Sequence, residues 1–373
     1  MIPNYQPSIS SCDVRSVAEV VEAGQISSQS NVVADFEQQF VQEIGNGLAL
    51  NGIATSSCTT ALHIALEVIK QVGDSSSTKV ICPSLTFISP VNMVLAAGLE
   101  PIFCDIDPIS FCFDEVHLEQ ILNEHNDLLA TIVVHNYGKY CLRQRALELL
   151  RKHQIFVIED WAEALGIPNN ENDFNIRGDF ACYSFFANKI ITTGEGGLIL
   201  TSNIEFAKRS KLLRDHGMHR NEGSYDFKIA GFNYRMTAMQ AALGLSQLRR
   251  LGEVAQKKQN QVTMINDLIT RYGIASLCSH AINIPYDINW MNLIKINRDP
   301  VTVDRICSRL RADKIDVRRV SQPCSMIRYL ENYEMRKTTG SEKVYLHHLT
   351  LPSWPDLEHH HFDFMIERIS VYL

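Results

Sequence analysis

The chain has 373 residues, of which 45% are hydrophobic and 21% are charged, a composition that excludes a disordered or fibrous protein. Its formal net charge of −7 argues against a nucleic-acid-binding protein, which usually carries a basic face. The length predicts one large domain and one smaller domain.

We expect a cytoplasmic protein without a signal peptide or a membrane span. The segment Met1–Gln6 lacks a basic stretch followed by an apolar run, and no apolar stretch approaches ~20 residues. The ten cysteines include no CxxC pair, which favours reduced thiols over disulfides or a zinc site. The run His359–His361 offers metal ligands, but a solvated surface run is the simpler interpretation, and we expect no metal.

Helix-like and strand-like segments alternate over residues 55–205. The predicted helices are 60–69, 91–95 and 142–153, and the predicted strands are 79–82, 101–105, 130–135 and 156–160. The strands are continuous apolar runs, as expected where helices cover both faces of a sheet. The alternation predicts an α/β fold with a mainly parallel sheet.

The pattern changes after Gly231. One long helix is predicted over 237–272, and short strands with one helix at 303–311 follow from residue 282 onward. We therefore expect a large α/β domain over residues 1–250 and a smaller α+β domain over residues 251–373.

A lysine and a carboxylate lie where strands are predicted to end. Lys189 follows an apolar run and precedes the glycine-rich turn Gly194–Gly197, and Asp160 ends the strand 156–160. Ligands of open α/β sheets bind at the carboxyl ends of the strands, so Asp160, Lys189 and His135 can converge on one crevice. Pyridoxal phosphate (PLP) chemistry needs such a pair, because the lysine binds the aldehyde and the carboxylate keeps the pyridine nitrogen protonated. Taken singly, Lys189 is also consistent with a solvated loop residue and Asp160 with a helix cap.

Small polar residues precede the predicted helix 60–69. Ser57, Cys58 and Thr59 place free amides at the positive end of that helix, which suits a phosphate group. A plain N-cap is the alternative. Ser184 offers a further hydroxyl.

Three more residues suit a flat cofactor ring. Ala162 is small enough to lie against one face of the ring, and Glu163 is spaced to reach the same pocket. Phe87 is a candidate for the other face, and a core position is its alternative.

Several of these motifs, in this order, resemble the DegT/StrS-type sugar-nucleotide aminotransferases, which have the aspartate-aminotransferase-like fold (PLP fold type I). The resemblance covers nearly the whole chain. The segments that carry it are Ser57–Leu66, Pro83–Phe87, His135–Gly138, Ile158–Asp160, Ser184–Gly197, Leu213–Gly217, Gly231–Met236 and Leu351–Pro355.

The resemblance implies that L-glutamate donates an amino group to C4 of a nucleotide-linked 4-keto-6-deoxy sugar. Lys189 would bind PLP and then act as the acid and base. The implied cofactor contacts are Ser57, Cys58, Thr59, Phe87, Asp160, Ala162, Glu163, Ser184 and Asn233. Asn233 would reach the phosphate from the partner subunit, which implies a homodimer with active sites at the interface. The implied sugar-binding residues are His135, Tyr137, Arg235, Arg318 and Ser325.

Some positions depart from the family pattern. Cys58 stands where the family commonly has glycine, Trp161 replaces a small residue, and the aromatic run usual in the family is largely absent from Arg318–Ser325. Because that last segment usually lines the sugar site, two alternatives stay open. One is amination at C3 or of a cyclitol ketone, and the other is an inactive family member with a regulatory role.

Overall fold

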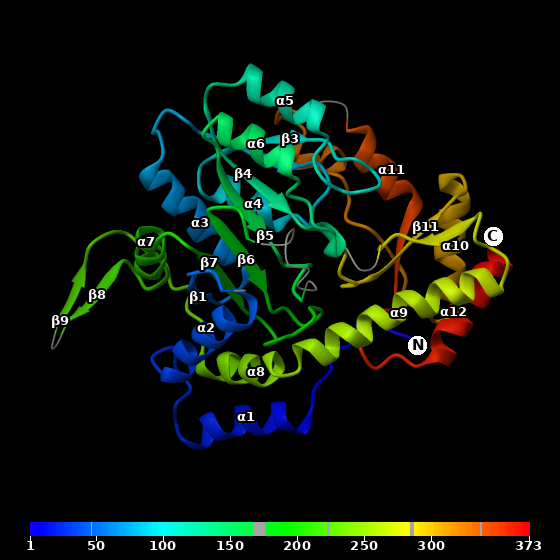
Figure 1. Ribbon diagram of the computed structural model, residues 1–373, viewed down its shortest axis with the longest axis horizontal. Helices are drawn as coiled ribbons and strands as arrows, with labels where there is room; N and C mark the ends of the chain where they lie inside the picture. Colours follow the sequence, from blue (N-terminus) through cyan, green and yellow to red (C-terminus); the bar gives the residue numbers. More distant parts are fainter. Residues whose placement is uncertain (46, 167–175, 222–223, 284–286, 336–337) are drawn as a thin grey trace.

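The computed structural model describes residues 1–373 except 46, 167–175, 222–223, 284–286 and 336–337. Its centre is a seven-stranded sheet in the order β1-β7-β6-β5-β4-β2-β3, parallel apart from β7, which is antiparallel to both neighbours (Figure 1). The strands are β1 (Asn51–Thr55), β2 (Lys79–Pro83), β3 (Glu100–Cys104), β4 (Leu128–Val134), β5 (Phe156–Asp160), β6 (Phe180–Ser184) and β7 (Gly197–Thr201).

Helices cover both faces of this sheet. In β2, the side chain of Ile81 joins one core cluster, whereas Val80 and Cys82 join the other. The first cluster includes α2 (Asn31–Ile44), α5 (Glu115–Glu124), α6 (Gln144–Lys152) and α8 (Ala238–Leu248). The second includes α3 (Cys58–Val72), α4 (Ser89–Ala96) and α7 (Ile204–Arg214). Continuous apolar strands therefore bury both of their faces, which confirms the predicted α/β fold.

The structure corrects one predicted element. The helix expected over 237–272 is interrupted at residues 249–250, so that α8 is followed by a separate helix, α9 (Leu251–Arg271). Strand β1 and helix α2 were not among the predicted elements, because their apolar residues form no run as long as those of the central strands.

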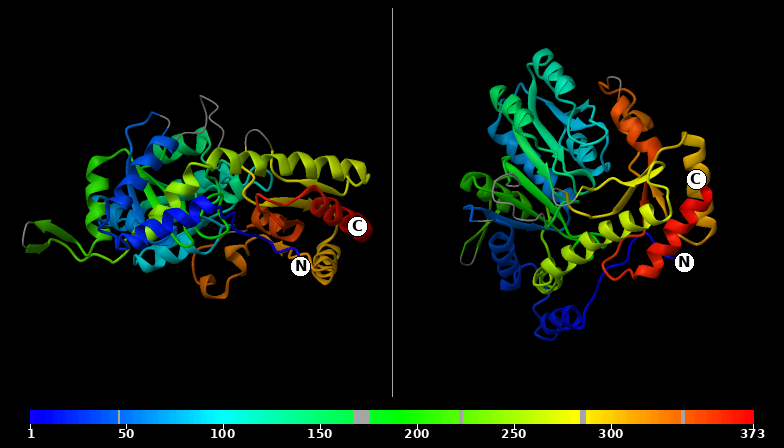
Figure 2. Two further views of the ribbon diagram at one scale, coloured as in Figure 1. Left: turned by 90° about the horizontal axis from the view of Figure 1, so that it is seen from below. Right: turned by 45° about the vertical axis from the view of Figure 1, so that its right-hand side comes forward.

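The C-terminal part is a four-stranded antiparallel sheet in the order β10-β11-β13-β12. Its strands are β10 (Cys278–His280), β11 (Asn292–Ile296), β12 (Arg318–Arg319) and β13 (His348–Leu351). A third core cluster joins this sheet to α9, α10 (Pro300–Ala312) and α12 (His359–Tyr372). Helix α9 extends from the large sheet region to this smaller one (Figures 1 and 2).

Two segments cross the division that we expected near residue 250. At the N-terminus, Ile2 forms a bridge with Ile315 and the side-chain amide of Asn4 donates to the carbonyl of Thr350, before α1 (Ser11–Glu22) packs on α8. In the other direction, the short helices Cys324–Met326 and Arg328–Leu330 pack on the large region, and α11 (Thr339–His347) places its Gly340 amide on Asp105. The two-domain division itself stays a prediction.

A two-stranded hairpin projects from the large region. It consists of β8 (Met218–Asn221) and β9 (Ser224–Phe227), and it extends away from the rest of the chain (Figure 1 and the left view of Figure 2). Among the described residues, none of the helices combines the length and the apolar character needed to cross a membrane.

Candidate active site

Five strand ends meet at one edge of the large sheet. Val134 of β4 pairs with Asp160 of β5, and Ser184 of β6 pairs with Gly197 of β7. Gly197 also pairs with Thr55, the last residue of β1, so the N-terminus of α3 lies at the same edge. The parallel pairing of β4, β5 and β6 and the antiparallel pairing of β7 with β6 and β1 therefore bring Asp160, Ser184 and the start of α3 together at one edge.

The loop after β6 carries Lys189, whose amide donates to the carbonyl of Phe186 at 2.9 Å. Its amine lies 4.0 Å from the centre of the Trp290 ring. Burial lowers the pKa of Lys189, and the negative charges of Glu163 and Asp160 oppose that shift. The neutral, nucleophilic form of the amine is thus more accessible than in a solvated lysine.

Two buried carboxyl groups lie near this amine. Asp160 is 3% exposed, and one of its oxygens accepts a hydrogen bond from the amide of Ala162 at 2.9 Å. Glu163 accepts from the amide of Tyr137 at 2.7 Å. Burial raises the pKa of both groups, that of Glu163 to about 7. A buried aspartate that keeps its charge needs a cationic partner, and a protonated pyridine nitrogen is one.

The start of α3 has a side-chain cap and also keeps free backbone amides. The hydroxyl of Ser57 accepts from the amide of Thr60 at 3.1 Å, and the side chain of Thr60 accepts in turn from the amide of Ser57. This is the capping box that we considered as the alternative. The cap leaves the first-turn amides of Cys58 and Thr59 without partners inside the helix, as required of an anion site.

Gly197 lets β7 approach this helix start closely. A Cβ at position 197 would lie 2.3 Å from the carbonyl carbon of Ser57 and 2.5 Å from the amide nitrogen of Cys58. The thiol of Cys58 points to the Asp160 carboxyl group, with 3.7 Å between Sγ and Oδ1. Ser184, at the end of β6, is buried, and its hydroxyl accepts from the amide of Phe186 at 3.3 Å.

The remaining predicted cofactor contacts lie around the same edge. Phe87 is 61% exposed, which excludes the alternative of a core residue and leaves its ring free. Ala162 is partly buried beside Asp160. The bulky Trp161 lies in the interior, where its ring packs 4.1 Å from that of His135 and stacks on Tyr183. Asn233 is exposed on a segment bridged to Asp215.

These groups fit PLP. The chain provides a desolvated amine, a buried carboxylate, amides at a helix start, a nearby hydroxyl and an exposed aromatic ring. In addition, the side-chain oxygen of Asn188, next to Lys189, is buried and has no hydrogen-bond partner within the described part of the chain.

The predicted sugar-binding residues do not all gather here. His135 is fully buried, with Nε2 on Glu159 at 3.1 Å and Nδ1 accepting from the amide of Cys141 at 3.0 Å, so neither nitrogen is open to a substrate. Its position after β4 was correctly placed at the sheet edge, but its ring points into the core, where it packs on Tyr140 and Trp161.

Tyr137 does lie near Lys189. Its ring centre is 5.8 Å from that of Trp290, the ring that the Lys189 amine contacts. Its hydroxyl accepts from the amide of Ser321 at 2.8 Å, which ties the segment Arg318–Ser325 to the site. Tyr137 has a positive φ of 55°, a strained conformation for a non-glycine residue.

The other three candidates for sugar binding interact with side chains of this chain away from Lys189. Arg235 pairs with Asp215 at 2.5 Å and donates to Ser28. Arg318 is exposed and pairs with Asp316 at 2.8 Å. Ser325 is exposed and its hydroxyl lies 3.4 Å from Glu342.

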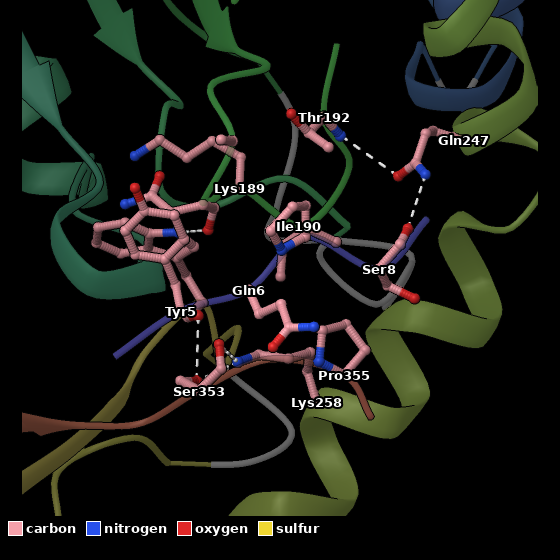
Figure 3. Close-up of a pocket in the computed structure, with 14 residues that line it drawn as sticks. Tyr5, Gln6, Ser8, Lys189, Ile190, Thr192, Gln247, Lys258, Ser353 and Pro355 are labelled. Atoms are coloured by element: carbon pink, nitrogen blue, oxygen red, sulfur yellow. Dashed lines mark hydrogen bonds between the residues drawn. The ribbon is translucent and has the colours of Figure 1, made fainter. Parts of the chain in front are cut away.

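A small cavity lies next to Lys189, between the N-terminal segment Tyr5–Ser8, α9 and the segment that follows β13 (Figure 3). Its lining includes Tyr5, Gln6, Ser8, Lys189, Lys258 and Ser353. Lys258 is 2% exposed and donates to the carbonyl and hydroxyl of Ser353. Burial lowers the pKa of Lys258 to about 7.

Sequence reasoning missed Trp290 and Lys258. Trp290 is one of three tryptophans and lies two residues before the strand β11, which is a weak signal. Lys258 lies in the charged stretch of a long helix, where nothing in the sequence separates it from its solvated neighbour Lys257. Within the part of the chain that the structure describes, no group of three or more potential metal ligands is found.

Comparisons with known proteins agree with this geometry. The family model of the DegT/DnrJ/EryC1/StrS aminotransferases matches residues 7–370. GDP-perosamine synthase of Caulobacter vibrioides is 37% identical over 82% of this chain and 81% of its own length. GDP-perosamine synthase of Escherichia coli O157:H7 is 31% identical over 99% of this chain and 98% of its own length. The solved structure of Helicobacter pylori PseC, an aminotransferase involved in the biosynthesis of pseudoaminic acid, covers 100% of this chain and 98% of its own with a TM-score of 0.90 at 22% identity.

Proposed function

Because this chain belongs to the DegT/DnrJ/EryC1/StrS aminotransferase family, we propose that it transfers an amino group from L-glutamate to C4 of a nucleotide-linked 4-keto-6-deoxy sugar, with PLP as cofactor. The observation that carries the proposal is the position of Lys189, whose partly buried amine faces two buried carboxyl groups beside a helix start suited to phosphate.

In this proposal, each residue at the sheet edge has a defined task. The amides of Cys58 and Thr59 and the hydroxyls of Ser57 and Ser184 bind the cofactor phosphate. Asp160 binds the pyridine nitrogen and Glu163 the ring hydroxyl, while Phe87 and Ala162 cover the two ring faces. When bound, PLP withdraws electrons from the substrate carbon and stores the amino group between the two half-reactions. Lys189 attaches the cofactor and then moves the proton.

We also propose a homodimer in which Asn233 of the partner subunit completes the phosphate site. The exposure of Asn233 supports this, as does the projecting hairpin with its exposed Tyr225 and Phe227. A location in the cytoplasm, expected from the sequence, stays a prediction.

The sugar is inferred from the relatives named GDP-perosamine synthase. Of the predicted sugar contacts, Tyr137 is favoured most, because it joins the lysine site to the segment that contains Ser321. Arg235, Arg318, Ser325 and His135 stay predictions, and each has to leave its present partner to reach a substrate.

A substrate panel tests this function. Purified protein is loaded with PLP and L-glutamate and offered GDP- and dTDP-linked 4-keto-6-deoxy sugars, a 3-keto sugar nucleotide and a cyclitol ketone. We expect one 2-oxoglutarate per active site with L-glutamate alone, and repeated release of 2-oxoglutarate together with an amino product only when a 4-keto sugar is present. Amination of the 3-keto sugar or the cyclitol would replace the proposed substrate by one of the alternatives. No reaction of bound PLP with L-glutamate would favour the inactive, regulatory alternative.

A further inference from the structure

A pair of cysteines lies between two loops at the carboxyl edge of the large sheet, outside the site described above. Cys112 belongs to the loop after β3, and Cys141 belongs to the loop after β4. The sulfur of Cys112 lies 3.6 Å from the carbonyl oxygen of Tyr140, and that of Cys141 lies 3.5 Å from the carbonyl oxygen of Phe111. Each thiol therefore contacts the residue that precedes the other cysteine, which places the two sulfurs next to each other.

A cation is held against one of the two sulfurs. The Nε of Arg143 donates to the sulfur of Cys112 at 3.2 Å. The hydrogen bond from the Cys141 thiol, together with Ser110 and Arg143, lowers the pKa of Cys112 to about 6 despite its burial. Burial raises the pKa of Cys141 well above its ordinary value. One member of the pair is thus favoured as a thiolate and the other as a thiol.

A small molecule has a route to this pair. Cys112 is 5% exposed, but Ser110, Tyr140 and Arg143, which all contact its sulfur, line a large open cleft. Three other buried cysteines differ from Cys112 in the pKa of the thiol and in the charge beside it. Burial raises the pKa of Cys58, Cys82 and Cys182 well above the ordinary value, and none of them has an arginine against its sulfur among the contacts of the described residues.

We propose that Cys112 and Cys141 form a peroxide-sensitive thiol pair, in which Cys112 is the thiol that is oxidised and Cys141 the thiol that resolves it into a disulfide. The Cys112 thiolate attacks one oxygen of hydrogen peroxide, the O–O bond breaks, and the departing hydroxide takes a proton to become water. The Cys141 sulfur then attacks the Cys112 sulfur, the S–O bond breaks, and the second hydroxide leaves with the Cys141 proton as water. Two thiols are oxidised and one peroxide is reduced to two waters.

The disulfide would join the loop after β3 to the loop that carries Tyr137. The amide of Cys141 also holds the ring of His135, and His135 in turn contacts Glu159 next to Asp160. Oxidation therefore acts on the loop that supports the proposed active site. Within the described part of the chain, the contacts of the two sulfurs are with other residues than the proposed cofactor residues.

Peptide mapping tests the proposal on the full chain loaded with PLP. The protein is treated with hydrogen peroxide, its free thiols are blocked with N-ethylmaleimide, and it is cleaved with trypsin and Asp-N protease. These proteases release residues 107–113, with Cys112 as the only cysteine, and residues 140–143, with Cys141 as the only one. We expect these two peptides joined by a disulfide, and the joined species lost after reduction with dithiothreitol.

Three variants define the roles. Cys112→Ser should leave Cys141 reduced, whereas Cys141→Ser should leave a sulfenic acid on Cys112 that dimedone traps. Arg143→Gln should slow the oxidation of Cys112 at pH 7 by at least about 3-fold, because Arg143 helps to lower the pKa of that thiol. The effect stays below about 30-fold, the ratio between a thiolate about 90% formed at a pKa near 6 and an ordinary one about 3% formed, because the hydrogen bond from Cys141 remains. Circular dichroism of each variant checks that its fold is retained.

Three cysteines are internal controls. Cys12 is exposed, whereas Cys82 and Cys324 are buried and lie near each other. We expect Cys82 and Cys324 to stay reduced under conditions that oxidise Cys112. The proposal is overturned if Cys12 is oxidised while Cys112 and Cys141 remain reduced, if Cys82 and Cys324 react as fast as Cys112, or if Cys112 is oxidised without joining Cys141.

Discussion

The amine of Lys189 lies 4.0 Å from the centre of the Trp290 ring, and the indole nitrogen of Trp290 donates to the carbonyl of Asn188 at 2.9 Å. Trp290 thus contacts both the lysine side chain and the backbone beside it, and it joins the loop after β6 to the C-terminal region. We infer that Trp290 positions Lys189.

Two substitutions separate these contacts. Trp290→Phe keeps an aromatic face and removes the hydrogen bond, whereas Trp290→Leu removes both. Because the packing of the ring against the Lys189 side chain and the hydrogen bond are each worth about 1 kcal/mol, the Leu variant should slow the half-reaction with L-glutamate roughly fivefold to thirtyfold, and the Phe variant less. Single-turnover absorbance changes of the bound cofactor measure this. A Leu variant as fast as the parent protein would exclude a positioning role.

Gly197 gives a test of the phosphate site. A methyl group there would collide with the backbone of Ser57 and Cys58, which cannot give way as a side chain can. Gly197→Ala should therefore lower the free energy of unfolding by about 2 kcal/mol and weaken the binding of PLP more than that of pyridoxal, which lacks the phosphate. Urea unfolding and equilibrium dialysis measure the two effects.

The control for this variant is Gly252→Ala on α9. A Cβ at position 252 would meet no heavy atom within 4 Å. Alanine is the better helix former, so this change should be neutral or stabilise by up to ~1 kcal/mol. Equal losses of PLP and pyridoxal affinity in Gly197→Ala would show that the glycine does not serve the phosphate.

Lys258 should make stability depend on pH. Burial lowers its pKa to about 7 in the folded chain, against about 10.4 in an unfolded one, so the unfolded chain binds more protons between these values. The free energy of unfolding should then rise with pH across this window, by up to ~1.4 kcal/mol per unit from this group. In Lys258→Met, this contribution disappears.

Urea unfolding of the cofactor-free protein at pH 7 to 10 measures the difference between parent and variant. That difference should change steadily with pH for Lys258→Met and stay constant for Lys208→Met, which alters an exposed lysine on α7. A constant difference for both variants would mean that the Lys258 amine is not desolvated in solution.

The sequence was sufficient for strands β2 to β5 of the central sheet because they are apolar on both faces, and a polar residue ends each of them or directly follows it. This placed Asp160 and Ser184 at one edge, together with the start of α3. The same reasoning failed for the direction of the His135 ring, because strand position does not say whether the next side chain turns outward or into the core. It also missed Trp290, which lies 102 residues from Asn188 in the chain and meets it only through the packing of the two regions.

The assignment of Arg235 shows a second limit. A motif gives the residue type and its order in the chain, whereas the ion pair with Asp215 depends on a turn that brings the two segments together. The break at residues 249–250 was hidden for a similar reason, since both flanking segments have helical patterns. The start of α9 packs in the same core cluster as α8, and only its later part reaches the C-terminal cluster.

The central claim is that Lys189 is the lysine that binds PLP, and one measurement addresses it directly. The protein is incubated with PLP, reduced with sodium borohydride and digested, and the modified lysine is located by mass spectrometry. Lys189 and Lys258 line the same cavity, so the neighbouring lysine serves as an internal comparison. We predict the pyridoxyl group on Lys189 and no specific label in Lys189→Met, whereas a label on Lys258, or none on the parent protein, would contradict the claim.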